Sequence, residues 1–143
     1  MRIRVLSAAM LLMAIGMGSA SATIRIDGDP GGRIEDYLAK YQNLRKSGEQ
    51  VVIDGVCSSA CTMVLGAVPR NRICVTSRAR LGFHSAWYPT SWGSTVPSPD
   101  GNRMLWSTYP REVRHWITQH GGLKRQMIYL SGSELAAMYP ACI

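Results

Sequence analysis

The sequence predicts an α/β domain built on a mostly parallel sheet, and two β-α-β patterns indicate this. In the first, an alternating segment at 23–27 and a β-branched run at 51–53 flank an amphipathic segment at 34–46. In the second, the run at 51–53 is followed by an apolar helical stripe that starts at Ser59 and by a strand-like segment at 72–75. A strand, a helix and a strand within about thirty residues imply a parallel pair with a right-handed crossover.

The first 22 residues have the pattern of a secretory signal peptide. Arg2 and Arg4 precede an apolar run at 5–17, and Ala20-Ser21-Ala22 fits a small-residue cleavage site. An uncleaved anchor is the alternative, but the run is short for a spanning helix. We therefore expect a periplasmic or secreted mature chain, Thr23–Ile143, that forms one domain and has no stable membrane span.

The charge balance gives little support to nucleic-acid binding. Loss of the signal lowers Lys plus Arg from 16 to 14 against 9 Asp plus Glu, a net charge of about +5. The basic residues are scattered, and no RNA-binding signature or basic run with interleaved aromatic residues occurs. The densest group, at 70–80, is interpreted as solvated strand flanks. We expect no nucleic-acid partner.

All four cysteines lie in the expected mature part. An even count in an exported chain predicts two disulfides, with three connectivities open. Cys57 and Cys61 lie within one helical turn, and Cys142 near the chain end can reach Cys74, so we favour the pairs Cys57–Cys61 and Cys74–Cys142. The histidines supply no zinc-ligand spacing, so we expect no metal site and no cofactor.

The elements follow in order. Turn residues at 28–32 precede the helix, for which Gly48 is a C-terminal cap. Asp54-Gly55 is expected to end the strand that begins at Val51. The segment 85–108, rich in Pro, Gly and aromatic residues, is expected to be a long loop. Either it lines the site as a lid, or it is a packed Ω-loop with its tryptophans in the core.

The C-terminal part is predicted to be regular again. Pro110 opens a helix that Gly121-Gly122 ends. A strand-like segment follows at 127–130. Ser131 and Glu134 then have the spacing of a capping box for a last short helix.

The residues that indicate chemistry are Ser59 and His84. A serine at the start of a helix lies where N–H groups favour developing negative charge. Ala79–His84 reads as a strand that ends in a histidine, and a serine with a histidine outlines nucleophilic catalysis. Serine is also an ordinary N-cap, so the pair alone does not establish catalysis.

These pieces resemble the Clp protease/crotonase superfamily, and within it the small exported Clp-protease-like proteins of bacteria. The resemblance is carried by Pro30-Gly31-Gly32, by the run Cys57-Ser-Ser-Ala-Cys-Thr62, by Gly82-Phe-His84 and, more loosely, by 129–135. It implies a minimal Clp/crotonase-like spiral of βαβ units. It further implies Ser59 as nucleophile, His84 as base, and the N–H groups of Gly32 and Ala60 as an oxyanion hole for a peptide or acyl substrate.

The chain departs from the family pattern in two ways. The opening strands and helix of the family are absent, so the ring assembly of the large Clp proteases is not expected. The catalytic acid is also missing, since Gln126-Met127-Ile128 stands where it is expected. The other acidic side chains, Asp54, Asp100, Glu112 and Glu134, remain candidates, and spacing selects none of them.

Three hypotheses follow from these observations. The first is an exported serine hydrolase, a peptidase or esterase with a Ser-His dyad or an incomplete triad. The second is a catalytically inactive Clp-like fold that binds a peptide or ligand in the periplasm. The third is a structural or redox-sensing exported protein. The sequence names no substrate and no oligomeric state.

Overall fold

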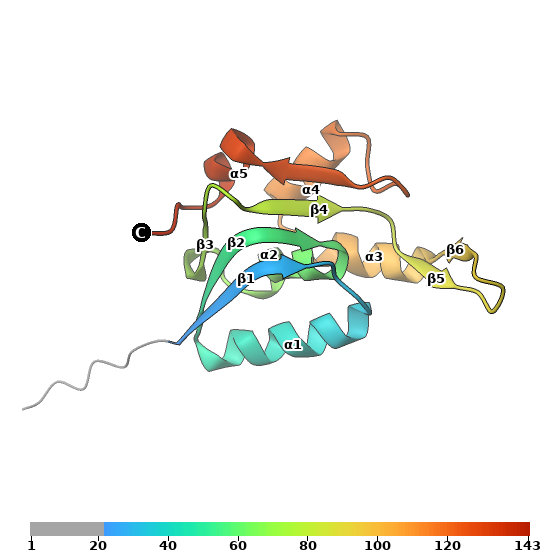
Figure 1. The fold of residues 1–143 in the computed structure, drawn as a ribbon, viewed down its shortest axis with the longest axis horizontal. Coiled ribbons are helices and arrows are strands. Elements are labelled where there is room, and N and C mark those ends of the chain that lie inside the picture. Colours follow the sequence, from blue (N-terminus) through green and yellow to red (C-terminus); the bar gives the residue numbers. More distant parts are fainter. Residues whose placement is uncertain (1–21) are drawn as a thin grey trace, which may run out of the picture.

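The computed structural model describes residues 22–143, so residues 1–21 of the expected signal peptide lie outside the described part. The centre is a five-stranded sheet with the strand order β1-β2-β4-β7, in which β3 also pairs with β2 (Figure 1). Its strands are β1 (Thr23–Asp29), β2 (Gln50–Ser58), β3 (Ile73–Val75), β4 (Arg80–Phe83) and β7 (Ile128–Ser131). Strand β2 pairs in parallel with β1, β3 and β4, and only the β4–β7 pair is antiparallel. The predicted mostly parallel α/β fold is confirmed.

Helices and a small hairpin complete the fold. The helical elements are α1 (Ile34–Ser47), the 3₁₀ turn η1 (Ser59–Met63), α2 (Val64–Ala67), the 3₁₀ turn η2 (Arg70–Arg72), α3 (Pro99–Thr108), α4 (Arg111–Gln119) and α5 (Gly132–Met138). Strands β5 (Trp87–Pro89) and β6 (Thr95–Pro97) form a separate antiparallel hairpin. Helix α1 runs along one face of the sheet, and the hairpin projects from one end of the molecule (Figure 1). No helix within residues 22–143 is long and apolar enough to cross a membrane.

Strand β2 is the organising strand, because two later strands share one of its edges. Its first half, from Val51, pairs with β3, and its last residues, Val56–Ser58, pair with β4. Strand β1 occupies the other edge along almost the whole length of β2. The end of β2 is therefore held on both sides, and Ser59 follows directly after it.

The expectation that Asp54-Gly55 ends the strand is wrong, because β2 continues to Ser58. Asp54 is buried and accepts hydrogen bonds from Arg25, Thr76 and Arg78. At Gly55, a Cβ would lie 2.0 Å from the carbonyl oxygen of Asp27, where the register of β1 shifts. This aspartate-glycine pair therefore marks a buried ion cluster and a close strand approach, not a turn.

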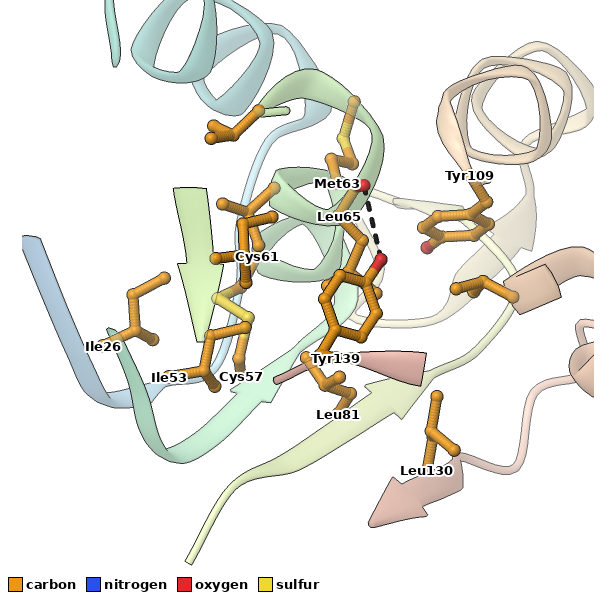
Figure 2. Close-up of a cluster of buried hydrophobic side chains, with 14 of the residues drawn as sticks. Ile26, Ile53, Cys57, Cys61, Met63, Leu65, Leu81, Tyr109, Leu130 and Tyr139 are labelled. Atoms are coloured by element: carbon orange, nitrogen blue, oxygen red, sulfur yellow. Dashed lines mark hydrogen bonds between the residues drawn. A yellow bond between two sulfur atoms is a disulfide. The ribbon is translucent and has the colours of Figure 1, made fainter. Parts of the chain in front are cut away.

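The core lies between the sheet and the helices on its face, and Figure 2 shows part of it. Tyr41 of α1 is fully buried and donates a hydrogen bond to the carbonyl of Cys61 at 2.8 Å. Tyr139, after α5, reaches the carbonyl of Leu65 at 3.5 Å, the dashed line in Figure 2. Burial raises the pKa of Tyr139 to about 12, so its hydroxyl stays a donor. Both contacts hold the η1–α2 segment against the core.

The segment 85–108 is not the irregular loop that its composition predicts. It forms the β5–β6 hairpin and then the ten-residue helix α3. The helix begins with Ser98 as N-cap, whose hydroxyl accepts from the N–H of Gly101 at 3.1 Å, and with Pro99 in its first turn. Serine before proline is a helix-start signal that the dense Pro and Gly content obscures.

Both expected disulfides are present. Cys57 and Cys61, with Cα atoms 5.4 Å apart, join the end of β2 to η1. Cys74 of β3 is joined to Cys142, with Cα atoms 4.9 Å apart. The N–H of Cys142 also donates to the carbonyl of Val75 at 3.0 Å. The predicted helix after Pro110 is confirmed as α4, whereas Ser131 precedes α5 without the side-chain hydrogen bond of a capping box.

Candidate active site

Ser59 occupies a sharp junction between strand and helix. Ser58 is still extended, with φ −117° and ψ 157°, and Ser59 then takes φ 56°. Ser59 is the one residue other than glycine with positive φ among residues 22–143. Such conformations cost about 1–3 kcal/mol and are concentrated at functional sites. The predicted helix start at Ser59 is correct in place, but its first turn is 3₁₀ and the α-helical part is four residues long.

The conformation of Ser59 is held from both sides. The Cys57–Cys61 disulfide spans the junction. The hydroxyl of Thr62 donates to the carbonyl of Ser59 at 2.6 Å and lies 2.8 Å from the hydroxyl of Tyr109. Because both ends of the turn are fixed, the Ser59 side chain is presented by a rigid support.

The glycine turn packs directly against Ser59. Gly31 has φ +85°, and a Cβ there would lie 2.5 Å from the carbonyl oxygen of Ser58 and 2.6 Å from the Cβ of Ser59. At Gly32, φ lies outside the left-handed range and a Cβ would meet only Tyr37, at 3.4 Å. Contacts within the protein therefore require glycine at position 31 of the turn.

The two glycines also differ in their N–H groups. Gly31 donates to Asp29 Oδ1 at 2.9 Å. No acceptor within residues 22–143 binds the N–H of Gly32. Asp29 also accepts from the Tyr37 hydroxyl and lies 3.5 Å from Lys40 Nζ. Burial and the Asp29 carboxylate raise the pKa of Tyr37, which keeps its hydroxyl a donor, so α1 holds the turn through Asp29.

His84 follows β4 and is oriented by main-chain groups. Its Nδ1 lies 2.8 Å from the carbonyl oxygen of Ser85, which can only accept a hydrogen bond. The N–H of Ser85 in turn donates to the carbonyl of Lys124 at 2.7 Å. A proton on Nδ1 leaves the lone pair on Nε2, the form that a general base requires.

No carboxylate among residues 22–143 forms an ion pair with His84. Three of the acidic candidates form ion pairs with other residues. Asp54 pairs with Arg25 and Arg78. Glu112 lies 3.8 Å from Arg70, and Glu134 lies 3.7 Å from His120. Asp100 pairs with Arg103, although it also lines the cavity described next. Among the described residues, the group that contacts His84 Nδ1 is therefore a backbone carbonyl, that of Ser85.

Ser59, His84, Gly31 and Gly32 all line one cavity of about 790 Å³. Its apolar wall comes from Ile34, Ala86, Trp87, Tyr88, Pro89, Met104 and Leu105, and Arg33, Glu35 and Asp100 supply its charged residues. The segment 85–108 thus forms one side of the cavity. Its tryptophans are exposed rather than packed in the core, which excludes the Ω-loop alternative.

The sequence predicts the side chains that line this cavity but not the groups that hold them in place. Asp29 precedes the glycine turn by two residues, and an aspartate that caps a turn in this way is a recognisable signal. Ser85 and Lys124 act through main-chain atoms, so their side chains give no signal. Ala60, the expected second oxyanion donor, is fully buried directly after Ser59. Residues 22–143 contain no group of three or more His, Cys, Asp or Glu side chains that could hold a metal ion.

The chain was compared with known families, sequences and structures. No protein-family model matches it, and no curated protein sequence matches it. Among solved structures it is similar to one described as ClpP1 N165D mutant from Listeria monocytogenes, with a TM-score of 0.48 and 16% sequence identity. That similarity covers 81% of this chain and 68% of the other chain. At this identity the likeness concerns the fold alone.

Proposed function

We propose that the protein is an exported serine hydrolase, a peptidase or an esterase, with Ser59 as nucleophile and His84 as general base. One observation carries the proposal: Ser59, in a left-handed conformation at the end of β2, lines the same cavity as His84 and the glycine turn. A strained serine between a strand and a helix is how several hydrolases expose their nucleophile. Export is supported by the two disulfides and by the signal-like first 22 residues.

The proposed reaction is acyl transfer. His84 Nε2 takes the proton of Ser59 Oγ as that oxygen attacks the substrate carbonyl. The N–H groups of Gly32 and Ala60 hold the resulting oxyanion, an effect worth about 2.7–4 kcal/mol per donor. The imidazolium then returns the proton to the leaving group, and an acyl-enzyme on Ser59 remains. His84 next takes a proton from water, whose oxygen attacks the acyl carbon, and the proton finally returns to Ser59.

The Ser85 carbonyl takes the place of the missing acid in one respect. It favours the correct tautomer of His84, which is part of what a triad carboxylate does. It is neutral, however, so it stabilises the imidazolium less than a carboxylate does. We therefore expect slower turnover than that of a complete triad.

The test is labelling with a fluorophosphonate probe. Wild type is expected to be labelled, whereas Ser59→Ala and His84→Gln are not. Ser58→Ala is the matched control, because Ser58 is the neighbouring serine but lines a different depression with Met127 and Tyr129. Ser59→Ala should shift the thermal midpoint by no more than about 1–2 °C, since it removes one small polar group. Equal labelling of wild type and Ser59→Ala would refute the assignment.

A second candidate function is a catalytically inactive binding module. It is favoured by one observation, the absence of an acidic partner for His84 within the described residues. Under this alternative wild type is not labelled, yet a peptide library still yields ligands whose binding is lost when the cavity is narrowed by Met104→Trp. Labelling that depends on Ser59 would exclude it.

A further inference from the structure

The β5–β6 hairpin presents an exposed aromatic surface. The exposed fractions are 47% for Trp87, 53% for Tyr88, 91% for Trp92 and 45% for Val96. The hairpin extends away from the sheet and the helices at one end of the molecule (Figure 1). Contiguous exposed apolar residues of this kind mark interaction surfaces.

Several polar groups at the tip of the hairpin are hydrogen-bonded within the hairpin. The N–H of Thr90 donates to the carbonyl of Ser94 at 2.8 Å, and the two hydroxyls of these residues lie 2.7 Å apart. The N–H of Gly93 donates to the carbonyl of Thr90 at 3.1 Å, and Trp92 lies between them. No residue from Ser85 to Pro99 carries a charge. These groups keep their hydrogen bonds when the tip leaves water, which lowers the cost of burying them in an apolar medium.

One basic side chain, that of Arg125, contacts the base of the hairpin. The carbonyl of Lys124 accepts from Ser85, and the guanidinium of Arg125 donates to the hydroxyl of Thr95. Within residues 22–143 Arg125 forms no ion pair with a carboxylate, whereas the Lys124 ammonium lies beside Gly121, after α4. The surface therefore combines an uncharged aromatic tip with the positive charge of Arg125 at its base.

We propose that this hairpin docks the protein on the surface of an anionic lipid bilayer, with Trp92 inserted at the level of the headgroups. Tryptophan and tyrosine prefer this interface because their rings combine an apolar body with a polar edge. Arg125 at the base of the hairpin complements anionic headgroups. The same hairpin lines the cavity through Trp87, Tyr88 and Pro89, so docking brings the cavity close to the membrane. The inference does not depend on the proposed hydrolase activity.

The test measures sedimentation with vesicles of phosphatidylcholine containing 30% phosphatidylglycerol. The protein used begins at Thr23, confirmed by intact mass, because the apolar run at 5–17 would bind lipid by itself. This form retains every contact described above. Wild type is expected to bind, and Trp92→Ala to lower the partition coefficient at least about tenfold, the loss expected for one large apolar side chain. Trp92→Phe should restore most of the binding.

Two further variants test how vesicle binding depends on the position of the tryptophan and on positive charge. Trp106→Ala removes a tryptophan that is 37% exposed but lies on α3, and it should bind as wild type does. Arg125→Gln keeps an N–H donor for Thr95 and should lower the preference for phosphatidylglycerol over pure phosphatidylcholine. Circular dichroism confirms the fold of each variant. The proposal is overturned if wild type binds neither vesicle, if Trp92→Ala binds unchanged, or if wild type self-associates without lipid in a way that Trp92→Ala abolishes.

Discussion

Replacement of Gly31 by alanine tests the contact on which the candidate site is built. Gly31 has φ +85°, and its new Cβ would lie 2.5 Å from the carbonyl oxygen of Ser58 and 2.6 Å from Ser59 Cβ. The left-handed conformation costs an alanine about 1–2 kcal/mol. The overlap with a main-chain oxygen and a fixed Cβ adds about 1–3 kcal/mol, as in overpacked cores. The free energy of unfolding should therefore fall by about 2–5 kcal/mol.

Urea unfolding of the disulfide-bonded protein measures this loss. With a typical slope for a small domain, the midpoint should fall by about 1–2 M. Gly32→Ala is the matched control next in the chain, because its Cβ would meet only Tyr37, at 3.4 Å, and its φ is ordinary. It should lower the free energy of unfolding by less than about 1 kcal/mol.

The same two variants test whether the glycine turn is needed for the reactivity of Ser59. Gly31→Ala must push the turn away from Ser59, so labelling by a fluorophosphonate should be lost in the fraction that remains folded. Gly32→Ala keeps its N–H group and should retain labelling. A Gly31→Ala variant as stable as wild type would mean that the turn does not pack on Ser59, and the reasoning about the site would fail.

Four further predictions concern stability and processing. In urea unfolding, Ser59→Gly should have a free energy of unfolding about 1 kcal/mol higher than that of Ser59→Ala, because glycine adopts φ 56° without strain. Equal stability of the two variants would argue against that conformation. Hydrogen bonds, above all from Arg78, hold the pKa of the Asp54 carboxyl well below its usual range. The stability due to Asp54 is therefore present above about pH 4 and is lost as the pH falls further. Asp54→Asn should have a lower free energy of unfolding than wild type at pH 7, and the difference should shrink in acid. A difference that stays constant with pH would contradict this. The Cys74–Cys142 disulfide closes a separation of 68 residues, so replacing both cysteines by alanine should lower the free energy of unfolding by about 4 kcal/mol. The same replacement of Cys57 and Cys61, which are 4 residues apart, should lower it by about 2 kcal/mol. Intact mass of the exported protein should show the loss of residues 1–22, whereas recovery of the full-length chain in membranes would support the anchor.

The sequence alone determined the features that depend on local periodicity and on residue chemistry. The helix from Ile34, with its cap at Gly48, and the helix after Pro110 follow from apolar spacing and end signals. The mostly parallel sheet follows from the order of strands and helices, because a β-α-β order permits few other pairings. The two disulfides follow from the count and spacing of the cysteines, and their pairing is the one expected.

The tertiary structure decided what local patterns leave ambiguous. Asp54-Gly55 has turn chemistry, but partners distant in sequence, Arg25 and Arg78, bury the aspartate and keep the strand extended. The choice of Gly31 as the essential glycine depends on the approach of Ser58 and Ser59, which no spacing in the chain encodes. The partner of His84 is the carbonyl of Ser85, and every residue has a carbonyl. Side-chain identity carries no information about such main-chain contacts, so only the path of the chain in three dimensions fixes them.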